Sequence, residues 1–218
     1  MTTHAATPKI LQSDRLSSRT RSILQARRTA PQTPTERTLS PAAYDTLTAL
    51  VPALLPQDEL LSPAEVIDLP HAIDRALTGP RDGWRFAELP SDACAWEYAL
   101  LTIAEHTHNQ FGASPHALSL DQLGLLLDSI TAGQIGNEAP QRLTAFQMQR
   151  WSSDFRADVI EAFLAHPHAQ QALGISAYLN GDDDTLTGFH NVTPDTAEAF
   201  EPIASTPLTA PQPQERSS

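Results

Sequence analysis

Apolar residues recur every three or four positions through the middle of the chain, which is the spacing of one face of a helix. The pattern covers five stretches: residues 39–56, 61–79, 89–112, 119–133 and 143–166. The alternation of apolar and polar positions that is typical of strands is not seen, and there is no tandem repeat. The pattern therefore predicts an all-α protein, an irregular bundle of about five helices.

Residues at the ends of these stretches predict where the helices begin and stop. Ser119 and Gln122 have the spacing of a capping box, and Ser62 and Glu65 have the same spacing. Both pairs therefore predict a helix start. Gly112 predicts the end of the third stretch. The middle of that stretch is apolar on all sides, so we expect a central, buried helix there.

The last stretch predicts a long helix with one buried face. Phe155, Val159 and Phe163 follow the helical spacing, and the adjacent Ile160 and Leu164 are assigned to the same buried face.

Two histidines, His166 and His168, flank Pro167 at the end of this helix. Proline cannot continue the hydrogen-bond ladder, and a cationic side chain is favourable in the last helical turn. We predict that the two histidines only end the helix and are exposed.

Charge and composition divide the chain into three parts. Residues 1–38 are rich in Thr, Ser, Arg and Pro, and seven basic against two acidic side chains give them a formal charge of +5. We interpret them as a flexible basic N-terminal arm. Residues 39–204 carry the periodic pattern and are predicted to form a helical domain. Residues 205–218 have the composition of a disordered tail.

The composition of the whole chain excludes several classes of protein. A formal net charge of −12 over 218 residues disfavours nucleic acid as the main partner, because its phosphates would be repelled. Cys94 is the single cysteine, which excludes an internal disulfide and a multi-cysteine metal site. No apolar run approaches the roughly 18 residues of a membrane span. No signal peptide is recognisable, so we expect a cytoplasmic protein.

One pair of residues suggests a metal site. Glu105 and His108 have the Glu-x-x-His spacing that places both side chains on one face of a helix. Di-iron bundle proteins need two such motifs, whereas this chain has one. His106 and His116 would have to complete a mononuclear site. The simpler interpretation is a polar helix end whose histidines complement the helix dipole, and we prefer it.

No motif of a nucleophile elbow, a phosphate-binding loop or a dinucleotide-binding fingerprint is found. We therefore assign no catalytic residue, no cofactor and no metal to this chain, and we expect that it is not catalytic by itself.

Three groups of residues have the character and order of motifs in one known family. They are Leu54-Leu55-Pro56, then Val66, Ile73, Asp74, Arg75 and Leu77, then Phe163, His166, Pro167 and Gly174. Over residues 39–182 the chain resembles the gluconate 2-dehydrogenase subunit 3 family. Its members are small helical subunits that accompany large FAD-dependent dehydrogenases of the glucose–methanol–choline type.

The resemblance implies a non-catalytic accessory subunit in a hetero-oligomer. It implies a partner that holds FAD and oxidises a sugar, sugar acid or glycoside by hydride transfer, while a separate acceptor takes the electrons. The small subunit would support the folding, stability or export of the large one. Many members carry a twin-arginine signal. Here no apolar segment follows Arg27-Arg28, so we expect an intracellular complex.

An obligate partner surface should leave large apolar side chains exposed on the free chain. Trp84, Phe86, Trp151 and Phe189 lie at element ends or in loops, and we predict that they contact the partner. The leading hypothesis is thus an accessory subunit. The alternatives are a metal-dependent helical-bundle enzyme that uses Glu105 and the nearby histidines, or an orphan interaction protein.

Overall fold

The computed structural model describes residues 7–12, 16–29, 37–79 and 86–175. These residues form eight α-helices and two short 3₁₀ helices, and they contain no strand. The prediction of an all-α bundle is confirmed.

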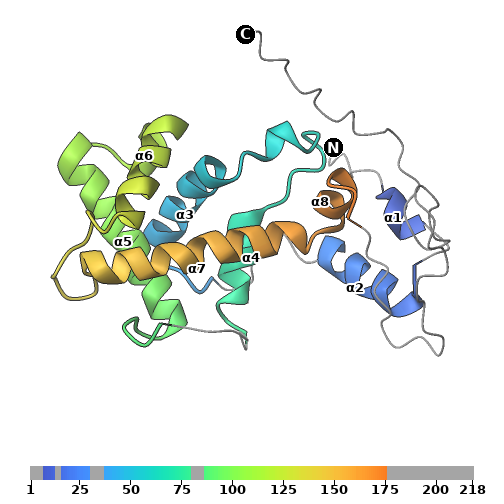
Figure 1. Cartoon of the computed structure of the whole chain (residues 1–218), viewed down its shortest axis with the longest axis horizontal. Coiled ribbons are helices and arrows are strands. Elements are labelled where there is room, and N and C mark those ends of the chain that lie inside the picture. Colours follow the sequence, from blue (N-terminus) through green and yellow to red (C-terminus); the bar gives the residue numbers. More distant parts are fainter. Residues whose placement is uncertain (1–6, 13–15, 30–36, 80–85, 176–218) are drawn as a thin grey trace, which may run out of the picture.

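Six helices make up the main bundle: α3 (Pro41–Leu54), α4 (Leu69–Ala76), α5 (Asp92–Phe111), α6 (Leu120–Thr131), α7 (Ala145–Leu164) and α8 (Pro167–Ala172). The 3₁₀ helices η1 (Gln57–Glu59) and η2 (Pro115–Ala117) follow α3 and α5. The long helix α7 runs across the molecule and packs against α4, α5, α6 and α8 (Figure 1). Helix α3 packs against α4, α5 and α6, so α3 and α7 together hold the bundle.

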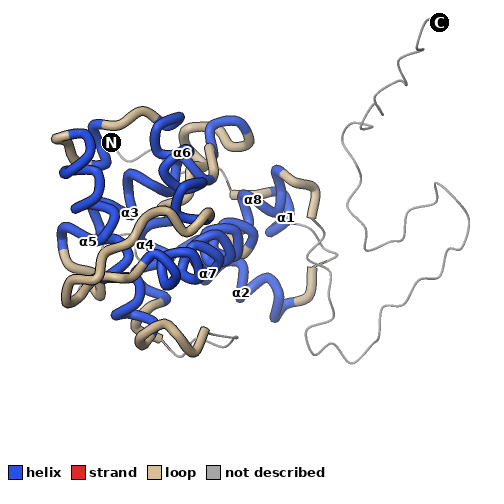
Figure 2. The backbone as a smooth tube through the Cα atoms, turned by 60° about the vertical axis from the view of Figure 1, so that its left-hand side comes forward, coloured by secondary structure: helices blue, strands red, loops and turns tan. Residues whose placement is uncertain are grey.

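Two further helices lie within the predicted N-terminal arm. Helices α1 (Lys9–Gln12) and α2 (Ser18–Thr29) pack against each other and against α8. They lie at the opposite end of the molecule from α5 and α6 (Figures 1 and 2). Leu11, Leu16 and Leu24 form a small buried cluster of their own. The arm therefore contains folded elements that contact the domain, in contrast to the prediction that it is flexible.

The helix ends predicted for α5 and α6 are confirmed. Gly112 follows α5 with a φ of 65°, a left-handed conformation that glycine adopts without strain. At the start of α6, the Ser119 hydroxyl accepts from the Gln122 N–H at 3.2 Å, and the Ser119 N–H donates to Gln122 Oε1 at 2.9 Å. The capping box thus satisfies two backbone N–H groups at the start of α6.

The predicted helix start at Ser62 is wrong. The Ser62 hydroxyl does donate to Glu65 Oε2 at 2.6 Å, and this bond is the main cause of the lowered pKa of Glu65. The pair closes only a turn, however, and α4 begins seven residues later, where Asp68 caps the N–H of His71 at 3.1 Å. Pro70 has no N–H to donate, so it fits the first turn of a helix and not its interior.

The centre of the core is an aromatic cluster of Trp96, Trp151 and Phe155. The ring centroids of Trp96 and Trp151 are 5.4 Å apart in an edge-to-face arrangement, and those of Trp151 and Phe155 are 5.2 Å apart and stacked. All three side chains are fully buried. Because α5 supplies Trp96 and α7 supplies the other two, the cluster joins the two longest helices.

A buried carboxylate fixes the start of α3 to α4. Asp74 is 1% exposed, and its oxygens accept from the N–H of Leu39 at 2.8 Å and from the N–H of Thr38 at 3.4 Å. The Thr38 hydroxyl also donates to the Asp74 carbonyl at 3.1 Å. These bonds provide the partners that a buried carboxylate requires. Asp74 therefore acts as a clamp between the two segments.

Candidate functional site

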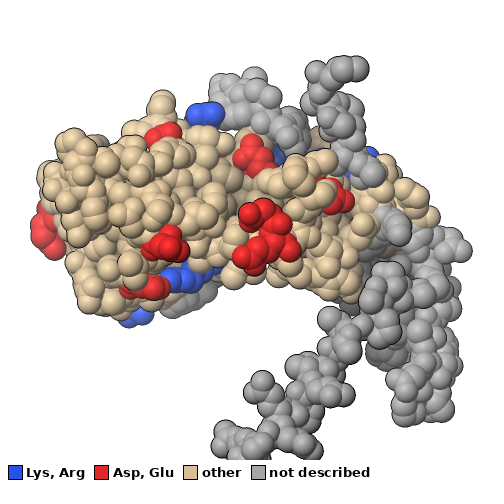
Figure 3. Space-filling model, turned by 90° about the horizontal axis from the view of Figure 1, so that it is seen from above, with Lys and Arg blue, Asp and Glu red and all other residues tan. Residues whose placement is uncertain are grey.

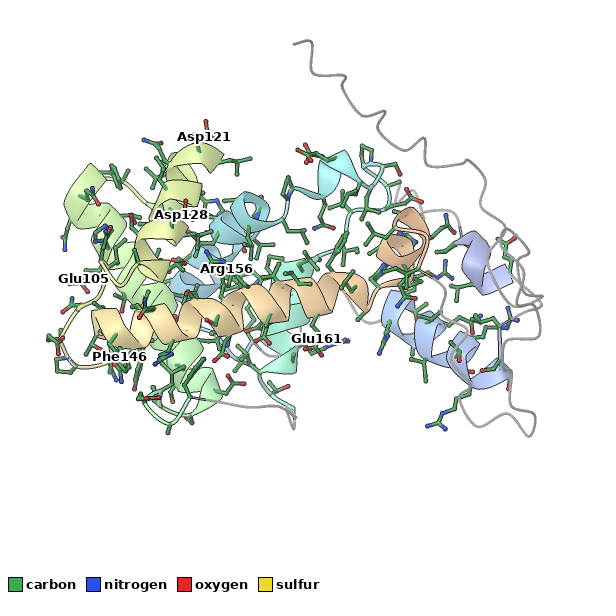
Figure 4. All side chains as sticks on the ribbon, viewed as in Figure 1. Glu105, Asp121, Asp128, Phe146, Arg156 and Glu161 are labelled. Carbon is green, nitrogen blue, oxygen red and sulfur yellow. The ribbon has the colours of Figure 1, made fainter. Side chains whose placement is uncertain are left out.

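Glu105, the carboxylate of the Glu-x-x-His pair, is bound by two residues of the loop before α7. Its Oε2 accepts from Arg142 Nε at 2.7 Å and its Oε1 accepts from Asn137 Nδ2 at 3.1 Å. Both carboxylate oxygens are thus used to hold residues 132–144 against α5. Figure 4 labels Glu105 near the end of the molecule where α7 begins.

The same loop makes a close backbone contact at Gly136. A Cβ atom built there would lie 2.0 Å from the N atom of Ala145, which is the first residue of α7. Nearby, the Asn137 N–H donates to the Leu143 carbonyl at 2.8 Å. Glycine is therefore required at this position because the two backbone segments touch.

His106, His108 and His116, the three histidines of the metal hypothesis, do not form a cluster with Glu105 that could hold a metal ion. His116 lies in η2 and pairs with Asp45 of α3 at 3.1 Å, and His108 is exposed in the last turn of α5. The part of the chain that the structure describes, which includes His106, contains no group of three or more His, Cys, Asp or Glu side chains placed to hold a metal ion. The metal hypothesis is therefore not supported for these four residues.

We expect Glu105→Gln to lower the free energy of unfolding by about 0.5–1 kcal/mol, because a partly exposed ion pair contributes little more than this. His108→Gln should change it by less than about 0.5 kcal/mol. Urea unfolding of both variants, with and without added Zn²⁺, measures these effects. A Zn²⁺-dependent rise in stability that both substitutions abolish would restore the metal hypothesis.

The aromatic residues predicted to contact a partner lie in different environments. Trp151 is 0% exposed, so its predicted role as an exposed partner contact is wrong. It lies one helical turn before Phe155 and belongs to the buried stripe of α7. Phe86 is half-buried, with the Arg150 guanidinium 5.2 Å from its ring centroid. Trp84 and Phe189 lie outside the described residues.

Helix α7 carries a second stripe, on the face opposite its buried one. Ile160 and Leu164 are 47% and 37% exposed, so the prediction that they are buried is wrong. They continue a line of exposed residues that starts at Phe146, which is itself 49% exposed, and passes through Ser153 and Ala157. We call these five residues the outer stripe of α7. From Phe146 to Leu164, a separation of 18 positions, it extends for about 27 Å.

The outer stripe has the spacing of a seam between two helices. With the half-buried Arg150 included, its positions are separated by four, three, four, three and four residues. This is the heptad spacing at which one helix packs along another. Ser153 and Ala157 in the middle are small enough for close approach, and Phe146 and Leu164 supply apolar side chains at the two ends. The sequence did not distinguish this stripe from the buried one, because apolar residues of both stripes follow the same helical spacing along one helix.

The two edges of the outer stripe differ. On one edge, Arg156 donates to the Thr131 hydroxyl of α6 at 2.7 Å and Gln149 donates to the Thr131 carbonyl at 2.9 Å, so α6 supports this edge. Glu161 is exposed beside the C-terminal half of the stripe. Figure 4 shows Phe146 and Glu161 toward opposite ends of α7, with Arg156 between them.

The folded body that carries the stripe is acidic overall. Residues 37–79 and 86–175 include sixteen acidic and five basic side chains. Figure 3 shows acidic groups spread over the visible face, with few basic groups among them. Asp121 and Asp128 lie on the exposed side of the neighbouring α6, next to the most exposed large apolar residue, Leu125. A partner for this region would therefore carry basic groups around an apolar surface.

A hollow of ≈ 600 Å³ opens between the start of α3 and the first turns of α5, and Cys94 is exposed on its wall. Glu97 in the same wall accepts from the Ser40 N–H at 3.0 Å. This carboxylate thus helps to hold the start of α3.

His166 and His168 are not exposed, in contrast to the prediction. His166 is half-buried and caps α8, because its Nδ1 accepts from the His168 N–H at 3.3 Å. His168 is 6% exposed, and its Nδ1 lies 3.2 Å from the Glu65 carbonyl oxygen. Burial lowers the pKa of His166 to about 4, with smaller contributions from His168 and Arg28. His166 is therefore neutral at pH 7, and both rings are packed inside the fold.

Comparison with known proteins gives one match. The family model described as Gluconate 2-dehydrogenase subunit 3 matches residues 41–179, which is more than half of the chain. No curated protein and no solved structure matches the chain.

Proposed function

Because the chain belongs to the gluconate 2-dehydrogenase subunit 3 family, we propose that it is the non-catalytic small subunit of an FAD-dependent sugar or glycoside oxidoreductase. In this proposal the large subunit holds the FAD and carries out the oxidation. The small subunit supports the folding, stability or activity of that partner and carries no cofactor of its own.

The observation that supports this proposal most is the outer stripe of α7. A chain that acts alone gains nothing from apolar side chains such as Phe146, Ile160 and Leu164 in one exposed line. A subunit that binds a partner gains affinity from them, because large apolar side chains are the usual anchors of an interface. We therefore propose that the large flavoprotein subunit covers this stripe.

The negative charge of the folded body favours binding of a different protein at the outer stripe over binding of a second copy of this chain. Two copies of this chain would bring two bodies of the same negative net charge together, which opposes self-association. A flavoprotein subunit with basic groups around an apolar groove would be attracted to it.

None of the helices in the described part of the chain has the length and apolarity that a bilayer crossing requires. The cytoplasmic location of the complex stays a prediction, and fractionation of the host cells tests it.

The test uses Ala157, the small exposed residue in the middle of the outer stripe. We expect Ala157→Arg to lower recovery of the flavoprotein at least tenfold when the tagged chain is purified from its own host. The long cationic side chain prevents close approach, and arginine is a good helix former, so the melting temperature should not change. The partner is identified by its sequence, its flavin absorbance and its oxidation of a sugar substrate.

The matched control is Ala117→Arg, the same substitution at an exposed alanine of η2. This variant should recover the flavoprotein as well as the unsubstituted chain does. If the unsubstituted chain recovers no flavoprotein, the proposed function is wrong. If both variants recover it fully, the function stands and the outer stripe is not the interface.

A further inference from the structure

Helices α1 and α2 contact the rest of the protein chiefly through α8. Their apolar residues Leu11, Leu16 and Leu24 form a cluster that is separate from the main core. In Figures 1 and 2 the three helices lie together at one end of the molecule. This pair of helices can therefore move away from α8 without opening the aromatic core.

Two arginines of α2 lie at this junction and place positive charge near His166. Arg27 Nη1 donates to the carbonyl of Ala165, the residue before His166, at 3.2 Å. Arg28 Nη1 donates to the Thr7 hydroxyl at 3.3 Å. Both acceptors are neutral groups, so these bonds do not cancel the charge of either guanidinium.

The two histidines at the junction are packed against each other and hydrogen-bonded. The rings of His166 and His168 are in edge-to-face contact, with centroids 4.9 Å apart. The Glu65 carbonyl oxygen beside His168 Nδ1 fixes the tautomer that carries hydrogen on that atom. The other ring atom, Nε2, is buried and has no hydrogen-bond partner among the described residues. His166 Nδ1 already accepts from the His168 N–H, so a proton added to His166 at Nδ1 would break the cap of α8.

We propose that α1 and α2 form an acid-sensitive clasp over α8, which opens when His166 takes up a proton. The charged and titratable groups that face the pair are Arg27 and Arg28 of α2 and Glu65 of the loop before α4. Arg28 opposes protonation of His166 while the clasp is closed. In the open state Arg28 is further away and water reaches the His166 ring.

The direction of the pH dependence follows from linkage. The closed clasp holds the pKa of His166 at about 4, and an exposed histidine has its ordinary value of 6.5. The closed state thus binds fewer protons than the open state between these two values. Closure is favoured fully above pH 6.5 and is lost progressively as the pH falls toward 4. Between pH 7.5 and 5.5 the ratio of open to closed chains should rise by up to about tenfold.

The experiment measures this opening with a buried thiol. In a Cys94→Ser background, Leu24→Cys places a thiol inside the clasp, and Gln25→Cys places one on the exposed neighbouring position. The ratio of their labelling rates cancels the pH dependence of the thiol chemistry. We expect the protection of residue 24 to fall five- to tenfold between pH 7.5 and 5.5. Hydrogen exchange of the α2 amides in the unsubstituted chain, corrected for intrinsic exchange, gives an independent readout.

His166→Asn is the decisive variant, because asparagine is a good helix cap but does not titrate. It should keep the protection seen at pH 7.5 and lose most of the change at pH 5.5. His108→Asn, at the exposed end of α5, is the matched control and should behave like the unsubstituted chain. The clasp proposal is wrong if residue 24 is unprotected at pH 7.5, or if His166→Asn leaves the pH dependence intact. No flavoprotein is present in this experiment, so its outcome does not depend on the proposed function.

Discussion

Replacement of Trp151 by alanine is expected to lower the free energy of unfolding by about 3–5 kcal/mol, which is typical of the loss of a fully buried aromatic side chain. Trp151 contacts both Trp96 and Phe155, so its removal leaves a cavity at the contact between α5 and α7. A domain has a total stability of roughly 5–15 kcal/mol. We therefore expect a large fall in melting temperature, measured by near-UV circular dichroism, and poor soluble yield.

Phe146→Ala is the matched control, because Phe146 is a large aromatic residue on the same helix but is exposed. It should cost less than about 1 kcal/mol of stability. The reverse order, with Phe146→Ala unfolding the chain and Trp151→Ala leaving it intact, would contradict the placement of the two faces of α7.

The second large effect is expected at Asp74. Asp74→Ala removes the acceptor of the Leu39 and Thr38 N–H groups and leaves buried donors unpaired, which costs about 3 kcal/mol. Asp74→Asn should cost about half as much, because the amide oxygen can still accept one of these bonds. Urea unfolding followed by far-UV circular dichroism measures both variants.

The control for this clamp is Asp58→Asn in η1, where the carboxylate is exposed and no stability change beyond about 0.5 kcal/mol is expected. If Asp74→Ala were as stable as this control, Asp74 would not be the residue that fixes the start of α3.

Local sequence signals predicted the helix ends that depend on neighbouring residues. Gly112 and the Ser119–Gln122 pair act within one helical turn, so the sequence contains the whole interaction. Ser62 and Glu65 make the same kind of bond without a helix after it. The difference lies in Pro70, whose preference for the first turn of α4 decided where that helix begins.

Long-range contacts explain what the sequence did not predict. Glu105 is bound by Arg142 and Asn137, which are more than thirty positions away, and nothing in its Glu-x-x-His spacing indicates this. The packing of α1 and α2 against α8 also joins distant segments, as the bond from Arg27 to the Ala165 carbonyl shows. A pattern of spacing indicates the faces of a helix, but it does not indicate which partner covers each face.

Helix α7 illustrates this limit most clearly. Its apolar residues fall into two stripes, and the spacing alone assigned Ile160 and Leu164 to the buried one and left Trp151 outside it. The structure reverses both assignments. Which face of α7 is buried depends on where α5 places Trp96. The contact between Trp96 and Trp151 joins distant parts of the sequence, so the spacing within α7 does not indicate it.

We expect the two faces of α7 to be under different evolutionary constraints. Substitutions at Phe155 or Trp151 would be removed by selection in any lineage, because they destroy the fold whether or not a second protein is present. Positions 146, 160 and 164 are free to drift toward polar residues once no second protein depends on them. Among related chains, the residues at these three positions would therefore distinguish lineages that keep the association from lineages that have lost it, with no change in the bundle itself.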